Sequence, residues 1–288
     1  MKIISIISAS MIALGAASCS DWTDMEIHDS HVTSRPEQDP QGYADYTRGL
    51  REFKASAHRI AYACLDNAPD RSVSERDFLR SLPDSLDLVA MRNADRLSAA
   101  DVADMTFVRA DYATRVLYRV DAAKGAQAVA DAAAAVRSGA FDGMVLASAT
   151  SVPDDMAALV SGLPGVLLFE GTPSLLPASA CDAFDWFIID ASAAKDSYDI
   201  ETAVRYSVAY AGIPAGKILL GVVPGASITD ADGVTRNSLA GAAYAANVTA
   251  GGLAGFAVNN VGADYYDADI IYKRLRGGIQ LLNPARHN

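Results

Sequence analysis

The stretch Gly143-Met144-Val145-Leu146-Ala147 decides the fold, because none of its five residues carries a polar side chain. A strand with one solvated face alternates polar and apolar side chains, whereas a strand covered on both faces is apolar throughout. Residues 143–147 therefore predict a buried strand of a parallel sheet. Neighbouring segments of the chain must then supply the layers that cover it.

Seven further short, mainly apolar runs occur along the chain. They are residues 59–63, 86–91, 115–120, 166–169, 186–189, 217–223 and 253–258. Segments with apolar residues at helical spacing separate them; one contains Ile200 and Val204, and we expect Asp199 to cap it. Eight strands alternating with helices predict an α/β protein with a single (β/α)8 TIM barrel. The competing topology is an open, doubly wound parallel sheet.

Composition excludes some classes of function. The 288 residues are 51% hydrophobic and 20% charged, which is typical of a globular protein. The net charge of -11 leaves no basic surface for nucleic-acid phosphates, so we expect no nucleic-acid partner. The same balance opposes adhesion to anionic lipid through a basic surface, but it leaves covalent lipid attachment open.

The first residues have the features of an export signal. Lys2 precedes an apolar stretch that ends in small residues before Cys19, so residues 1–18 predict a cleaved signal peptide. Residues 14–19 (Leu-Gly-Ala-Ala-Ser-Cys) resemble a bacterial lipobox, which implies lipid attachment at Cys19; the alternative is an ordinary secretory signal with an incidental cysteine. The acidic residues that follow resemble the surface-export tag of Bacteroidetes lipoproteins. We expect residues 19–50 to form the acylated cysteine and a flexible tether, and residues 51–288 to form the barrel.

Several common catalytic sites are missing from the sequence. The four histidines lie in the tails or at the start of the first strand, so no Ser/His/Asp triad can be assembled at a barrel mouth. The sequence contains neither a phosphate-binding glycine loop after a strand nor a zinc-protease motif. Cys64 and Cys181 lack the spacing of metal ligands, and we expect two buried free thiols rather than a disulfide. No metal and no cofactor are expected.

Five stretches, taken in order, carry a family resemblance. They are residues 21–24, 82–87, 185–189, 272–276 and 279–284, which read Asp-Trp-Thr-Asp, Leu-Pro-Asp-Ser-Leu-Asp, Asp-Trp-Phe-Ile-Ile, Tyr-Lys-Arg-Leu-Arg and Ile-Gln-Leu-Leu-Asn-Pro. Together they resemble Bacteroidetes lipoproteins of glycoside hydrolase family 18. The resemblance implies a chitinase-like or endo-β-N-acetylglucosaminidase-like barrel that acts on glycans containing N-acetylglucosamine.

The catalytic end of the family signature is lost. That signature reads Asp-Gly-x-Asp-x-Asp-x-Glu on the fourth strand, and residues 142–149 keep only its first Asp-Gly. The resemblance places Ala149 where a Glu protonates the glycosidic oxygen, and Ala147 where an Asp orients the acetamido group. It makes Asp142 a structural position. Because a methyl group can neither donate a proton nor offset charge, these positions imply a catalytically inactive barrel.

Other carboxylates could replace the lost ones. Glu170 and Asp190 end the fifth and sixth strands, and Asp121 ends the third, so an acid/base pair at the mouth is conceivable. The structural alternative for each of them is a solvated strand end or a cap.

Binding without cleavage needs aromatic and planar polar side chains at the barrel mouth. The candidates for glycan binding are the residues that follow the first, second and eighth strands: Asn67, Arg92, Asn93, Asn259, Asn260, Tyr265 and Tyr266. Each could instead cap the barrel without touching a ligand.

These observations lead to one expected function and two alternatives. We expect a catalytically inactive family 18-like surface lipoprotein, held on the outer membrane by lipid on Cys19 and exposed at the cell surface. It would bind glycans containing N-acetylglucosamine for a glycan uptake system, with an outer-membrane transporter complex as partner. One alternative is an active chitinase or endo-β-N-acetylglucosaminidase with relocated carboxylates. The other is a protein-binding scaffold of the uptake complex.

Overall fold

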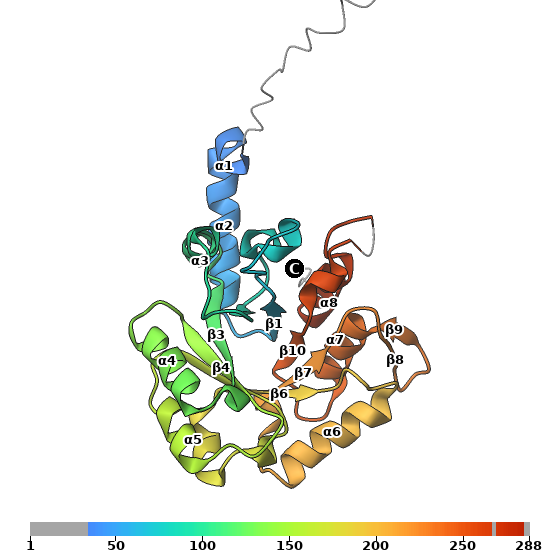
Figure 1. Ribbon diagram of the computed structural model, residues 1–288. Coiled ribbons are helices and arrows are strands. Elements are labelled where there is room, and N and C mark those ends of the chain that lie inside the picture. Colours follow the sequence, from blue (N-terminus) through green and yellow to red (C-terminus); the bar gives the residue numbers. More distant parts are fainter. Residues whose placement is uncertain (1–33, 267–268, 285–288) are drawn as a thin grey trace, which may run out of the picture. The chain divides into compact units, whose positions relative to one another are not determined.

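The computed structural model describes residues 34–266 and 269–284 (Figure 1). The predicted signal peptide, Cys19 and the acidic residues after it lie outside the described residues. The chain divides into two units, residues 1–44 and 45–288. In the first unit, the described part contains α1 (Arg35–Gln38), with a capping box between Ser34 and Glu37.

The second unit is built around a closed barrel of eight parallel strands. Each strand pairs with the next along the chain, and the last pairs with the first through Ile60 and Gly255. Closure confirms the predicted (β/α)8 barrel and excludes the open sheet. The barrel strands are β1 (Ile60–Leu65), β2 (Leu88–Met91), β3 (Arg115–Asp121), β4 (Gly143–Ala147), β5 (Val166–Glu170), β6 (Trp186–Asp190), β7 (Ile218–Val222) and β10 (Gly255–Val258).

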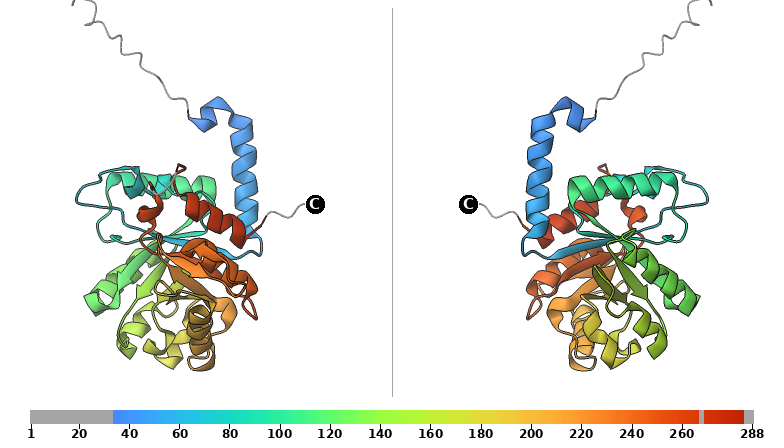
Figure 2. Two further views of the ribbon diagram at one scale, coloured as in Figure 1. Left: turned by 90° about the vertical axis from the view of Figure 1, so that its right-hand side faces the viewer. Right: turned by 90° about the vertical axis from the view of Figure 1, so that its left-hand side faces the viewer.

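Helices cover the outside of the barrel. They are α3 (Ala99–Tyr112), α4 (Ala126–Arg137), α5 (Asp154–Val160), α6 (Ser197–Ala209), α7 (Ser238–Val248) and α8 (Lys273–Leu282). Figure 2 shows α7 and α8 side by side, and α7 packs against β7 and β10. A short antiparallel hairpin, β8 (Ser227–Thr229) with β9 (Thr235–Asn237), precedes α7. In the described chain, 3₁₀ turns replace the helices expected after β1 and β5: Glu75–Asp77, Leu79–Ser81, Pro173–Leu175 and Ala178–Ala183.

The strands are mostly apolar because they face two cores. Tyr62, Leu117, Val145 and Leu168 belong to a cluster that fills the barrel interior. The alternate residues pack outward against the helices in a larger cluster, which includes Phe187. Burial inside the barrel raises the pKa of the Cys64 thiol to about 11, and both Cys64 and Cys181 are free; Cys181 is only half-buried.

Aspartates fasten the amino-terminal ends of neighbouring strands together. The carboxylates of Asp87, Asp142 and Asp185, which precede β2, β4 and β6, accept hydrogen bonds at 2.7–2.8 Å. The donors are the backbone N–H groups of Ala61, Val116 and Leu167, each on the preceding strand. Because a charged acceptor strengthens a hydrogen bond, these contacts stabilise the strand register at this end of the barrel.

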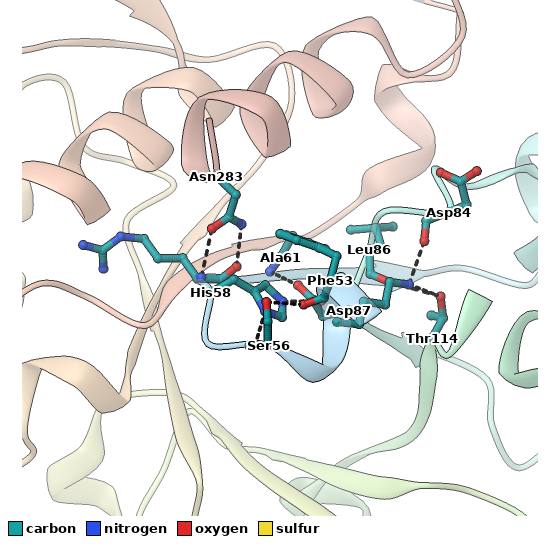
Figure 3. Close-up of polar contacts among 11 residues, drawn as sticks. Phe53, Ser56, His58, Ala61, Asp84, Leu86, Asp87, Thr114 and Asn283 are labelled. Carbon is teal, nitrogen blue, oxygen red and sulfur yellow. Dashed lines mark hydrogen bonds and ion pairs between the residues drawn. The ribbon is translucent and has the colours of Figure 1, made fainter. Parts of the chain in front are cut away.

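Two cations join this end of the barrel to the segment before β1 (Figure 3). Lys54 donates to the backbone oxygens of Asp84 and Leu86 at 2.6 Å, and burial lowers the pKa of its ammonium group to about 8. His58 lies 2.8 Å from a carboxylate oxygen of Asp87, with the side chains 7% and 4% exposed. The hydrogen bond to Asp87 raises the pKa of His58.

Two expectations about local structure were wrong. Pro40–Ala55 forms a helix, α2, where a tether to residue 50 was expected. Its apolar residues recur at helical spacing, and ion pairs such as Arg48–Asp45 at 2.8 Å support its solvated surface; these apolar residues are Tyr43, Tyr46, Leu50 and Phe53. The cap of α6 is Asp196, which accepts from the N–H groups of Tyr198 and Asp199. Asp199 lies in the first turn instead.

Candidate functional site

A cavity of about 950 Å³ opens at the carboxyl-terminal mouth of the barrel. This is the end at which (β/α)8 enzymes carry their active sites. The strand ends of β3, β4, β5, β6 and β10 line it, together with the loop after β5 and one face of α6. The cavity thus occupies the place where the sequence predicted a site.

The wall that β4 and the residues after it contribute to the cavity carries no carboxylate; it consists of Ala147, Ser148 and Ala149. Ala147 ends β4 and is 4% exposed, and Ala149 follows it at the mouth; both line the cavity. Asp142 lies at the opposite end of β4, where its carboxylate accepts from Arg109 Nε and Val116 N, each at 2.7 Å. The only acid that β4 keeps from the signature is therefore used to hold the fold.

Glu170 is held by two side chains from other strands. Its Oε2 lies 2.7 Å from Arg119 Nε on β3, and its Oε1 accepts from Asn259 Nδ2 after β10 at 3.3 Å. The side chains of Arg119 and Glu170 are each 17% exposed. Burial acts to lower the pKa of Arg119, but the hydrogen bond with Glu170 raises it overall, so the guanidinium stays charged. Both carboxylate oxygens of Glu170 therefore already have partners.

The two other candidate acids belong to turns. Asp121 Oδ1 accepts from Ala123 N at 2.9 Å and caps the 3₁₀ turn after β3. Asp190 Oδ1 accepts from Ser192 N at 2.9 Å. Both aspartates line the cavity, but one oxygen of each is occupied by the backbone.

The structure does not bring the predicted glycan-binding residues together. Asn259 lines the mouth cavity, whereas Asn93 and Asn260 line a second cavity of about 660 Å³ over the ends of β1, β2 and β10. Arg92 is half-buried and is among the lining residues of neither cavity. Asn67 is 2% exposed, and its side chain bridges Asp101 and the N–H of Asn93.

The paired tyrosines after β10 differ from the expected stacking platform. Tyr265 is 3% exposed, and its hydroxyl donates to Glu75 at 2.7 Å, so it packs within the fold and cannot stack on a sugar. Tyr266 is 69% exposed, with its ring edge-on to Tyr265 at 4.4 Å, and it lines neither of the two cavities. The prediction that Tyr265 binds glycan is therefore wrong, because its hydroxyl is held by Glu75, which is far away in the sequence.

Two residues that line the cavity, Arg119 and Tyr206, were not predicted from the sequence. Arg119 lies in the middle of an apolar run, and its inward position could have been inferred from alternation with Leu117 and Asp121. Tyr206 reaches the cavity from α6, where Asp199, Thr202 and Tyr206 share one face at helical spacing.

Two further properties concern the described residues alone. Among them, no group of three or more His, Cys, Asp or Glu side chains is arranged to hold a metal ion. None of the helices described is both long and apolar enough to cross a membrane.

Comparison with solved structures shows the same architecture. BT1044 superposes with a TM-score of 0.70 at 17% sequence identity, covering 86% of this chain and 95% of that chain. An endo-β-N-acetylglucosaminidase from Cordyceps militaris gives 0.59 at 14% identity, covering 83% and 96%. The chitinase ChiB from the chitin utilization locus of Flavobacterium johnsoniae, of family 18, gives 0.53 at 10%, covering 78% and 95%. At these identities the likeness shows the fold.

Sequence comparison adds a family. No curated protein matches the chain. Residues 23–137 match the family model described as glycoside hydrolase family 18, BT1044-like. The resemblance to glycoside hydrolase family 18 is thereby confirmed: residues 23–137 carry the BT1044-like pattern of that family, and the described barrel has the fold of its solved proteins.

Proposed function

We propose that this protein is a catalytically inactive family 18-like barrel that binds glycans containing N-acetylglucosamine. One observation carries the proposal: the mouth cavity presents Ala147 and Ala149 from β4, and its Glu170 has both oxygens occupied. A site with room for a sugar thus lacks a carboxyl group at the family's catalytic positions, and its Glu170 is already paired.

The lost groups matter because each would act on the transition state. General acid–base catalysis by a positioned side chain contributes about 10²–10⁴-fold in rate. The resemblance assigns that role to the position of Ala149, whose side chain has no proton to give. For Glu170 to replace it, the carboxylate would have to leave Arg119 and expose a paired, mostly buried guanidinium.

The lining suits a neutral sugar. Hydroxyl groups of Thr172 and Ser192 and the amide of Asn259 can exchange hydrogen bonds with sugar hydroxyls, while Leu175 and Ile189 offer apolar surface to ring C–H groups and an acetamido methyl. The described lining includes the acids Asp121, Glu170, Asp190 and Asp199, and its one arginine is paired with Glu170. Such a lining disfavours glycans that carry carboxylate or sulfate groups.

Location and partners belong to the proposal as well. The lipobox-like residues before Cys19 support a lipid anchor, and the acidic residues after it support exposure on the outer membrane of a Bacteroidetes cell. A surface barrel that holds a glycan without cutting it would serve an uptake system, handing the glycan to a transporter complex in the outer membrane. Mass analysis of the mature amino terminus and protease shaving of intact cells test these two points.

Calorimetry tests the binding function. The chain from Ser20 onward is titrated with neutral chitin oligosaccharides, neutral N-glycans and sialylated N-glycans. We expect heat of binding with a neutral ligand, and at least tenfold weaker binding of the Asn259→Ala variant. Absence of binding to all three glycan classes would contradict the proposal and favour a protein-binding scaffold.

A matched pair of variants tests the enzyme alternative. If Glu170 or Asp190 were a relocated catalytic acid, turnover by the chain would stop in Glu170→Gln or Asp190→Asn. The proposal predicts that the unmodified chain already forms no product, so the substitutions change nothing in a cleavage assay.

A further inference from the structure

We infer that the glycan site continues from the barrel mouth onto the outer helix α6, where Tyr206 stacks on a sugar ring of a longer oligosaccharide. This inference rests on the proposed function and deepens it, because it states the length of ligand and names a residue that selects it.

The shape of the cavity is the first reason. Besides the strand ends, the lining includes Asp199, Thr202, Ala203 and Tyr206, which lie along one face of α6. Beside that face, the chain between β5 and β6 forms only 3₁₀ turns, Pro173–Leu175 and Ala178–Ala183, instead of a covering helix (Figure 1). The cavity can therefore extend along α6 instead of ending at the barrel mouth.

The orientation of the tyrosine is the second reason. Tyr206 is 45% exposed although it lines a cavity. Its ring packs against Tyr210 with centroids 5.3 Å apart and planes at 33°, which limits its freedom before any ligand arrives. An exposed aromatic ring with few rotamers offers apolar contact at low entropic cost, and its hydroxyl adds a polar handle.

Polar groups bridge the space between the mouth and this ring. Thr202 presents an exposed hydroxyl one helical turn before Tyr206. Asp199 stands a turn earlier, and only its Oδ2 is used, by Lys195 N at 2.8 Å. The carboxylate of Asp199 and the hydroxyl of Thr202 can bind sugar hydroxyl groups, and the ring of Tyr206 can stack on a sugar ring. Such a row of contacts suits a chain of neutral sugars.

The spacing sets the length of the ligand. Asp199 and Tyr206 are seven residues apart, or about 10 Å along a helix axis. We expect a mono- or disaccharide seated between Arg119 and Asn259 at the strand ends to occupy the mouth without contacting Tyr206. Longer oligosaccharides would gain the contacts on α6 as well.

The test compares two ligand lengths in the same titration. Chitobiose and chitin hexaose are titrated into the chain from Ser20 onward and into its Tyr206→Ala, Asn259→Ala and Tyr198→Ala variants. Tyr198 is the matched control, since it is 67% exposed on the same helix and does not line the cavity. Equal thermal unfolding of the variants verifies that each is folded.

We expect Tyr206→Ala to weaken binding of the hexaose about tenfold, while affinity for chitobiose stays unchanged. Asn259→Ala should weaken both ligands, and Tyr198→Ala neither. Hexaose affinity that is equal in Tyr206→Ala and the unmodified chain overturns the inference alone, provided that Asn259→Ala still weakens binding. If the unmodified chain binds neither sugar, the inference fails; the proposed function fails with it only if neutral and sialylated N-glycans do not bind either.

Discussion

Replacement of Glu170 by Gln tests whether this residue holds the fold or performs chemistry. The substitution keeps the shape of the side chain but removes the charge 2.7 Å from Arg119 Nε. Loss of one partner from a fully buried ion pair costs about 3–5 kcal/mol. Because both side chains are 17% exposed, solvent screens part of this charge, and we expect Glu170→Gln to lower the free energy of unfolding by about 2 kcal/mol.

Urea unfolding of a double-mutant cycle measures this cost. Arg119→Met removes the other charge, and the double variant with Glu170→Gln leaves no unpaired charge, so the two losses should be less than additive by at least about 1 kcal/mol. Asp190→Asn is the control, because Asp190 is exposed and should change stability little. Unchanged or increased stability of Glu170→Gln would refute the reasoning, since removal of a catalytic group often stabilises a protein.

Three further predictions concern the amino-terminal end of the barrel. Asp142→Ala should cost about 1–3 kcal/mol in urea unfolding, because a strand N–H and a guanidinium lose their acceptor; a loss below about 0.5 kcal/mol would contradict this role. Gly143→Ala should cost about 4 kcal/mol or more, since the added Cβ would lie 2.0 Å from a backbone oxygen of the next strand, whereas Gly277→Ala has open space and should be tolerated; equal stability of the two variants would be the contrary result. The hydrogen bond to Asp87 raises the pKa of His58, so its stabilising contribution is complete below the ordinary histidine pKa and is lost as pH rises through the raised value. Unfolding of the unmodified chain should therefore become easier across that range, relative to His58→Gln, and parallel pH profiles would contradict the assignment.

The strands were predictable because their chemistry is local. Each barrel strand needs apolar side chains on both faces, and all eight runs, from Ile60–Leu65 to Gly255–Val258, became strands. The helices were less predictable. The 3₁₀ turns after β1 and β5 follow from tertiary packing. By contrast, α2 could have been predicted from the helical spacing of Tyr43, Leu50 and Phe53, which the expectation of a tether overlooked.

The site was predictable in location but not in composition. The rule that strand ends form the mouth placed Ala147, Glu170 and Asn259 correctly at one cavity. It could not reveal that Tyr265 is buried, because its hydroxyl binds Glu75, which is 190 positions away in the sequence. The strand-end rule also did not select Arg119, because Arg119 lies before the end of β3. Its ion pair with Glu170, two strands further along the barrel, is seen only in the structure.

The central claim is that the mouth cavity holds a glycan without cutting it. The most direct measurement first records a binding isotherm of chitin hexaose with the chain from Ser20 onward. The same sample, at equal concentrations of protein and hexaose, is then incubated, and the sugars in it are identified by mass spectrometry. We predict that the protein binds the hexaose saturably and that the hexaose is recovered intact. Shorter sugars above the level of a protein-free control would contradict it and would mean that a catalytic acid other than the lost one at Ala149 operates in the cavity.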